Sequence, residues 1–386
     1  MPERFYQVFF DDEPAADDFY PRVIELEVED NADQADAFRL KLGIRLGDDG
    51  EWSDVDADQF ALFAKLRVEA GFKDGATEIL TEGYITDVRL HFEDPARQPY
   101  LEVHGLDASV LMSLEEKIVA WPNLSDSDIA TQILASYGFT PDVTSTDPVH
   151  QENDVTVIQR GSDLEFLRRL ARKNGFEAGV EKDAATGLVT GYFRQAALDG
   201  SPQKALAVGF GDASSLTSFD VKVDGVKPLA VESDQIDVKA KAANSGTGTQ
   251  LQLTAIGDRD LDALVGSTID SLISPKEAAG KLWLYTVPTS DATELTTLAQ
   301  AVRDEAGWLV TARGEINSDA YGAVLRANRL ALVKGAGASY SGKYYVTRVV
   351  HHIGSDGRYQ QTFEARRNAV GVDGSEDFGD VPSLAV

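Results

Sequence analysis

Residues 157–176 read VIQRGSDLEFLRRLARKNGF, and this stretch does most to decide the fold. The spacing of Ser162 and Glu165 predicts a capping box that opens a helix. Four residues recur at helical spacing and predict the buried face of this helix: Phe166, Leu167, Leu170 and Ala171. Gly175 is expected to end the helix, because glycine readily takes the left-handed conformation at a helix C-terminus.

Two further helices are predicted on either side, over residues 125–138 and 291–306. Each of the three helices is followed by a glycine and an aromatic residue: Gly138-Phe139, Gly175-Phe176 and Gly307-Trp308. We expect the glycine to cap the helix and the aromatic ring to pack back on it. The pattern therefore indicates a helix-to-strand connector rather than a binding motif.

Outside the helices, apolar and polar residues alternate with a period of two, which predicts antiparallel strands. The N-terminal segments of this kind are residues 22–29, 38–46, 62–68 and 79–92. The C-terminal segments are residues 219–223, 229–231, 236–240, 309–316, 330–333, 344–352 and 359–366. Residues 241–288 are mixed, and their start, residues 242–250, is rich in Gly, Ser and Thr and predicts a loop.

Two of these strands share a sequence pattern. Residues 84–91 read YITDVRLH and residues 345–352 read YVTRVVHH. Each segment is followed by a turn signal and by another strand, so the two hairpins predict a duplicated β domain. Chance similarity between two amphipathic strands is the alternative, since Tyr, Val and Thr are common in strands.

Composition excludes several classes of function. The chain has 386 residues, no cysteine and a formal charge of −28. Disulfides, cysteine zinc sites and thiol nucleophiles are therefore excluded, and we expect neither nucleic-acid recognition nor stable membrane insertion. The acidity itself fits solubility in a salt-rich habitat or an acidic lumen that does not retain passing cargo, and both interpretations stay open. The N-terminus has no signal-peptide pattern, so we expect a soluble protein made in the cytoplasm.

No motif in the sequence carries recognisable catalytic, cofactor-binding or metal-binding chemistry. The five histidines lack metal-ligand spacing, and His351 and His352 are adjacent on a predicted strand, where they would point to opposite faces. The short glycine pair Gly335-Ala336-Gly337 predicts a hairpin loop. One cationic cluster on the polar face of the central helix is a candidate partner contact: Arg168, Arg169, Arg172 and Lys173. A solvated face near a helix C-terminus is the alternative for this cluster.

The central stretch resembles phage late control protein D and the hub part of type VI valine-glycine-repeat tip proteins. The matching residues are Gln159, Arg160, Ser162, Asp163, Phe166, Leu167, Leu170, Gly175 and Phe176. The C-terminal segment resembles the closing hairpin of that family, through Gly342, Tyr345, Val346, Thr347, Arg367 and Asn368. The resemblance covers about residues 1–370, and none of its motifs is catalytic.

The resemblance implies a mainly β chain with an α/β insert and two similar antiparallel β-barrels, which assemble as a homotrimer into a pseudo-sixfold ring. It implies barrel one at residues 1–107, an α/β hub domain at 108–204 and barrel two at 205–370. An insert at about 241–290 interrupts barrel two, and residues 371–386 are expected to be an acidic, flexible tail.

The function implied is that of a non-enzymatic baseplate hub in a phage tail or contractile injection particle. Its expected partners are a hexameric tail tube, a separate trimeric spike and baseplate proteins. Two rivals remain: a receptor- or glycan-binding tail protein, and a cell-wall hydrolase used in penetration.

Overall fold

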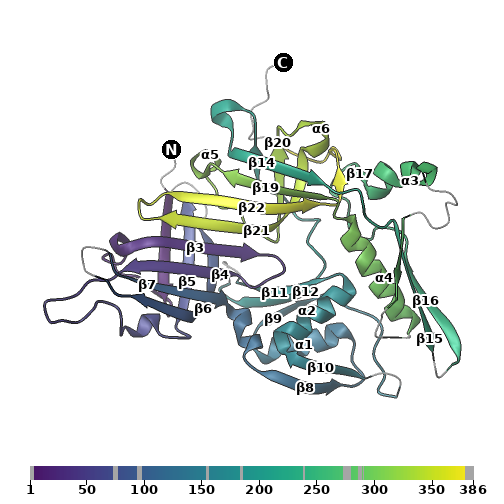
Figure 1. The fold of residues 1–386 in the computed structure, drawn as a ribbon, viewed down its shortest axis with the longest axis horizontal. Helices are drawn as coiled ribbons and strands as arrows, with labels where there is room; N and C mark the ends of the chain where they lie inside the picture. The colour runs from purple at the N-terminus through teal and green to yellow at the C-terminus, as the bar shows by residue number, and fades with distance from the viewer. Residues whose placement is uncertain are drawn as a thin grey trace.

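The computed structural model describes residues 4–72, 77–93, 98–153, 156–182, 186–237, 240–272, 280–285, 289 and 291–378. A long, curled and largely antiparallel sheet dominates these residues, with few helices beside it (Figure 1). The mainly β fold class predicted from the sequence is therefore confirmed.

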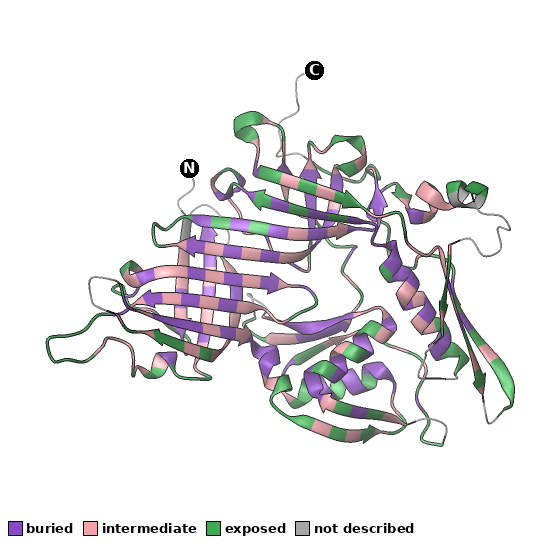
Figure 2. Cartoon of the chain, in the orientation of Figure 1, coloured by how far each residue is buried: buried purple, intermediate pink, exposed green. Residues whose placement is uncertain are grey.

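The N-terminal unit of this sheet has six main strands. They are β1 (Arg4–Phe10), β3 (Val23–Asn31), β4 (Ala37–Gly43), β5 (Lys65–Phe72), β6 (Glu78–His91) and β7 (Tyr100–Asp107), and the short β2 (Glu13–Pro14) pairs with β1. Across the sheet they follow the order β3-β4-β7-β6-β5-β1. Buried and exposed residues alternate along them (Figure 2), because successive side chains of a strand point to opposite faces.

The C-terminal unit has the same strand order. Its strands are β13 (Gln203–Ala207), β14 (Leu216–Val223), β19 (Val310–Ile316), β20 (Leu330–Lys334), β21 (Gly342–Gly354) and β22 (Tyr359–Arg367). Across the sheet they follow β14-β19-β22-β21-β20-β13. Numbered along the chain, both units therefore read 2-3-6-5-4-1. The last pair differs in direction, since β13 runs parallel to β20 whereas β1 runs antiparallel to β5.

Irregularities of register fall at matching positions in the two units. The β6–β7 ladder shifts between Ile85 and Asp87, and the β21–β22 ladder shifts between Val346 and Arg348. These are the residues that the sequence repeat aligns. A second shift occurs on β3 between Val23 and Glu25 and on β14 between Leu216 and Ser218.

A threonine at the equivalent position in each unit bonds across the register shift in β6 and in β21. The Thr86 hydroxyl donates to the His104 carbonyl at 3.4 Å, and the Thr347 hydroxyl donates to the Glu364 carbonyl at 3.2 Å. Two hairpins that share strand order, bulge position and bulge closure are not a chance similarity of amphipathic strands. The two hairpins thus share their strand context and bulge geometry as well as their sequence pattern.

The two units meet edge to edge. The second half of β21, from Arg348 to Gly354, pairs antiparallel with β3 over the residues from Asn31 back to Glu25. Since β3 also pairs with β4, the sheet runs through both units as thirteen strands. We call this junction of β21 and β3 the internal seam.

An α/β segment lies between the units in the chain. It contains β8 (Glu116–Trp121), α1 (Asp126–Ser136), β9 (Thr140–Val143), β10 (Val157–Ser162), α2 (Asp163–Asn174), β11 (Glu177–Lys182) and β12 (Val189–Arg194). α1 and α2 are the first two helices predicted from the sequence, and their buried faces meet in one apolar core.

An arm projects from the C-terminal unit between β14 and β19. It consists of β15 (Ala230–Asp237), β16 (Ala242–Gly248) and β18 (Lys281–Leu284), packed against α4 (Ala292–Gly307). The remaining short elements are α3 (Ser267–Leu272), α5 (Ser318–Tyr321), α6 (Gly337–Tyr340), and β17 (Arg259–Asp260), which pairs with β23 (Ala369–Val370). Within the described ranges, no helix combines the length and apolar character needed to cross a membrane.

Two details differ from the predictions. The segment predicted as a loop at residues 242–250 contains strand β16, because Gly246 and Gly248 let this strand lie directly against the backbone of α4. Gly307 is not a left-handed cap like Gly138 and Gly175. It is the last helical residue, and its missing side chain makes room for Leu251.

Candidate assembly site

Asp163 is the centre of the motif that opens α2. Its buried carboxylate accepts hydrogen bonds from Gln159 Nε2 at 2.6 Å, Lys117 Nζ at 2.6 Å and the Tyr137 hydroxyl at 2.7 Å. Burial alone would raise the pKa of Asp163, but these donors lower it below its usual value. Ser162 caps the helix beside it. The motif therefore locks β8, β10 and α1 to the start of α2.

The rest of the helical motif is core, as the spacing predicts. The helix buries Phe166, Leu167 and Leu170. Gly175 has a φ of 69°, and the ring of Phe176 packs edge-on against Phe193 at 5.3 Å. These residues hold the α/β segment together.

Arg160 is the motif residue that faces outward. It lies on the exposed side of the two-stranded β8–β10 ribbon, opposite Ile118, which is 83% exposed. Ile158 on the same side is also exposed. This face of the ribbon is available for contact with another protein.

The C-terminal motif holds the chain that returns from the arm. The buried Arg367 donates to the carbonyl oxygens of Ser341 at 3.0 Å and Ile256 at 3.2 Å. The Asn368 side chain accepts from the Ile256 N–H at 3.0 Å and donates to the Thr254 carbonyl at 2.8 Å. Both residues are thus anchors within the chain.

Tyr345 links the C-terminal unit to the α/β segment. Its hydroxyl lies 2.6 Å from Glu177 Oε2, and its ring stacks on Trp308. Arg366 also lies over the ring of Trp308 and pairs with Glu177 at 2.9 Å. Burial raises the pKa of Glu177, although the Arg366 guanidinium acts in the opposite direction. Gly342, at the start of β21, has a φ of 127° that favours glycine.

Lys173 does not belong to an open cationic face, so the predicted partner contact is wrong for this residue. Its ammonium lies 2.7 Å from Asp126 Oδ2 and 2.9 Å from Glu294 Oε1. It ties α2 to α1 and α4 inside the molecule.

The three arginines of the predicted cluster occupy different surroundings. Arg169 is exposed and lies over the ring of Phe166. Arg168 and Arg172 line a cleft of about 450 Å³ between α2 and α4. Asp304 and Glu305 also line this cleft, so it can accept a segment that carries both charges.

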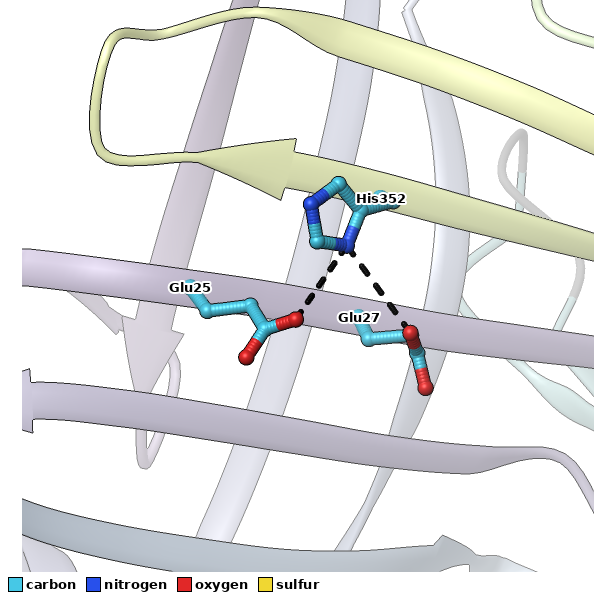
Figure 3. A group of neighbouring side chains, drawn as sticks. All are labelled: Glu25, Glu27 and His352. Carbon is cyan, nitrogen blue, oxygen red and sulfur yellow. Dashed lines mark ion pairs between the residues drawn. The ribbon is translucent and has the colours of Figure 1, made fainter.

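Glu25, Glu27 and His352 gather on the polar face of the internal seam (Figure 3). His352 Nδ1 lies 3.5 Å from Glu25 Oε1 and 3.8 Å from Glu27 Oε2. Arg39 on β4 approaches the same two carboxylates, at 2.8 Å and 3.8 Å. With a guanidinium already between the acids, the group is an ion-pair row across three strands. His351 points to the other face, as predicted, and bonds to the Tyr359 hydroxyl.

Arg326, which fastens the two units to each other, was not predicted from the sequence. Its guanidinium pairs with Asp30 on β3 and donates to the backbone carbonyls of Ile79 and Leu80 on β6. One signal was present in the sequence. Asp30 follows Val28 by two residues, so it stands at a position where the alternation of the strand predicts an apolar side chain. A carboxylate at such a position is expected to need a buried partner.

Comparison with known proteins identifies similarities that cover nearly the whole chain. The family model described as the Alg8 N-terminal domain matches residues 18–355. No curated protein sequence gives a significant match.

Solved structures give clear matches of fold. A 43 kDa tail protein of prophage MuSo2 from Shewanella oneidensis has a TM-score of 0.61 at 13% identity, over 95% of this chain and 100% of that one. A tail protein from Neisseria meningitidis MC58 has a TM-score of 0.63 at 11% identity, over 95% and 97% of the two chains.

A third structure comes from a different machine. It is a component of the Escherichia coli type VI secretion system, described as similar to the bacteriophage T4 tail proteins gp27 and gp5. Its TM-score is 0.52 at 15% identity, over 94% of this chain and 76% of that one. At these identities the similarity concerns the fold, which is that of phage tail and type VI components.

Proposed function

The chain belongs to the Alg8 N-terminal domain family, and from its tail-protein fold we propose that it is a baseplate hub. In this role it joins a hexameric tail tube to a trimeric spike in a phage tail or contractile injection particle. The role is mechanical: the hub transmits force to the spike and keeps a continuous lumen with the tube.

The duplicated six-strand unit supports this proposal most strongly. Two units with the same strand order lie side by side in one chain, joined by the internal seam. Three such chains supply six similar units for a sixfold partner while the assembly keeps threefold symmetry for the spike. A homotrimer therefore resolves the symmetry mismatch without a second kind of subunit.

We assign a proposed role to each segment in its order along the chain. Residues 1–107 and 205–370 form the two barrel units of the ring, and residues 108–204 form the hub domain between them. The arm corresponds to the insert at about 241–290. The acidic tail, residues 371–386, is proposed to help dock the spike. Its described part begins beside β21, where Lys343 pairs with Asp373 at 3.0 Å.

Arg160 and the three arginines Arg168, Arg169 and Arg172 are the proposed contacts for neighbouring baseplate proteins. They lie on the α/β segment. The proposal includes no catalytic role, because the motif residues described above bond to the chain's own backbone and side chains.

Cryo-electron microscopy of the parent particle's tip, reconstructed without imposed sixfold symmetry, tests the proposal. Three copies between the tube and the spike are expected. Six copies, or a position on fibres or sheath, would refute it.

One observation favours the rival of a glycan-binding tail protein. Trp283 and Tyr285 are close in the chain at the end of the arm's sheet, and they are 41% and 83% exposed. Exposed aromatic rings of this kind bind sugars by stacking. Binding of the isolated chain to a glycan array, lost in a Trp283→Ala variant, would support the rival.

A further inference from the structure

At the internal seam, β21 of one unit pairs with β3 of the other. In the described part of the chain, the equivalent strand edges elsewhere in the sheet lack such a partner. In the C-terminal unit, β21 pairs with β20 through its first residues and with β3 through its second half. In the N-terminal unit, β6 pairs with β5 as far as Tyr84, matching the point, Tyr345, at which β20 stops. Among the described residues, the second half of β6 has β7 on one flank and no strand on the other.

The other unpaired edge of the described sheet is β14, which lies at one end of the strand order and is the counterpart of β3. Paired residues across the N-terminal unit form the row Val28, Phe38, Gly105 and Ile85. Paired residues across the C-terminal unit form the row Val221, Ala312, Ala365 and Val346. Because Ile85 and Val346 are equivalent in the repeat, Val221 is the equivalent of Val28.

This equivalence gives a register for a second seam. Within the chain, His351 faces Val28, His352 faces Glu27 and Ile353 faces Leu26. Replacing each residue by its counterpart places Leu90 opposite Val221, His91 opposite Asp220 and Phe92 opposite Phe219.

The polar face of this second seam repeats the ion-pair row of Figure 3. At the internal seam, Arg39, Glu27 and His352 lie side by side on three strands. Their counterparts are Arg313, Asp220 and His91, and Asp220 and Arg313 already lie directly opposite each other in the β14–β19 ladder. The order cation, anion, histidine is thus the same, although His91 lies in the N-terminal unit and Asp220 and Arg313 lie in the C-terminal unit.

The apolar face of the second seam is open where the internal seam is closed. Leu26, Val28 and Ile353 are 1%, 1% and 2% exposed. On the free edges, Leu90 is 36% exposed and Phe92 is 50% exposed. Free strand edges with exposed apolar residues are templates for pairing with another chain.

We infer that β14 of one chain pairs antiparallel with the second half of β6 of a second copy, in the register that places Asp220 opposite His91. The contact is head-to-tail, because it joins two different edges of the chain: β14 in the C-terminal unit and the second half of β6 in the N-terminal unit. Repetition of a head-to-tail contact closes into a ring when its rotation permits. Only the number of three copies rests on the proposed hub function.

Disulfide cross-linking of the full chain tests this register, since the chain has no cysteine of its own. His91→Cys and Asp220→Cys variants are mixed in equal amounts and oxidised. We expect a covalent dimer in the mixture and none from either variant alone. The double variant is expected to give a covalent closed ring of about three times the chain mass of 41.8 kDa.

Asp87→Cys mixed with Asp220→Cys is the register control. Asp87 lies on the same face as His91 but four residues away, which is about 13 Å along a strand. Disulfides require Cα atoms within about 7 Å of each other, so this pair is expected to stay unlinked. Equal cross-linking of both pairs, a dimer from His91→Cys alone, or a chain that remains monomeric would overturn the inference.

A charge-reversal pair gives a second measurement. Asp220→Arg is expected to raise the dissociation constant of the assembly by about tenfold or more, because it faces His91 across the seam. Glu315→Arg makes the same change of net charge on the neighbouring strand β19, away from the seam, and is expected to have little effect. An equal effect of both variants would contradict the seam.

The outcomes for the seam and for the hub can be told apart. A cross-linked ring located elsewhere in the particle would refute the hub and retain the seam. Three copies at the tube–spike junction without the cross-link would retain the hub and refute the seam.

Discussion

At the scale of single residues, the buried face of α2 gives a direct test of the core. Leu170→Ala removes a side chain that is 4% exposed and is expected to lower the free energy of unfolding by about 2–5 kcal/mol. Leu188→Ala is the matched control, because Leu188 is 57% exposed and its loss is expected to cost within about 0.5 kcal/mol. Urea unfolding of both variants measures the difference, and equal values would place Leu170 outside the core.

Arg326 is the residue on which the contact between the two units most depends. Arg326→Met leaves the Asp30 carboxylate buried without its cation and is expected to destabilise the chain by about 3–5 kcal/mol. Adding Asp30→Asn removes the stranded charge, so the double variant is expected to recover part of the loss. Thermal unfolding of the two single variants and the double variant checks this coupling. Additive losses would show that the two side chains do not act as a pair.

Asp36 makes the stability of this region depend on pH. Burial raises its pKa well above the usual value, and the nearby Asp30 and Asp107 carboxylates act in the same direction. A group whose pKa is raised by folding stabilises the chain below its unfolded pKa of about 3.9, and this contribution is lost as pH rises through the folded pKa. Asp36→Asn removes the charge, so its stability relative to the natural chain is expected to increase between about pH 4 and pH 8.

Urea unfolding at several pH values within this range measures that relative stability. The exposed Asp212→Asn serves as the control for the loss of one acidic group. A difference that does not change with pH, or that decreases as pH rises, would contradict the role of Asp36.

At the scale of elements, the arm depends on two glycines of β16. A side chain at Gly246 would meet the backbone carbonyl carbon of Leu295 at 2.2 Å. Gly246→Ala is therefore expected to separate β16 from α4 and to destabilise the chain by about 1–3 kcal/mol. Gly200→Ala is the control, because a side chain there meets nothing within 4 Å. Faster amide hydrogen exchange in β16 and α4 of the Gly246 variant is the expected local result.

These glycines also explain where sequence reasoning failed. Residues 242–250 have the composition of a loop, and only the neighbouring helix makes Gly246 and Gly248 suitable for a strand. By contrast, the N-terminal caps of α1 and α2 were predictable, since each depends on a few residues close in the chain. Lys173 was misplaced because its partner Glu294 lies in a helix more than a hundred residues away.

At the scale of the whole molecule, the repeat was visible in the sequence only as one hairpin. Thr86 and Thr347 preserve it because both close a bulge, whereas the flanking strands β3 and β14 share little besides Val28 and Val221. Their equivalence depends on pairing between distant strands, which a single sequence does not reveal. The continuous sheet therefore had to be learned from the structure.

The net charge of the whole chain predicts a salt effect on association. Copies that each carry a formal charge of −28 repel at long range, and salt shortens that range from about 30 Å at 0.01 M to about 8 Å at 0.15 M. Self-association is therefore expected to strengthen over this interval, as measured by sedimentation velocity. Weaker association at the higher salt concentration would mean that ion pairs across the contact outweigh the net repulsion.

The arm occurs in only one of the two units. In the N-terminal unit, residues 32–36 connect β3 to β4, whereas residues 224–309 separate β14 from β19 and carry the arm. In the proposed ring, the strands therefore recur six times and the arm three times. A surface formed by the repeated strands and a surface formed by the arm then need different numbers of mutations to change. Adapting to a changed tube requires matched mutations in both halves of the gene, whereas adapting a surface formed by the arm requires mutations in only one.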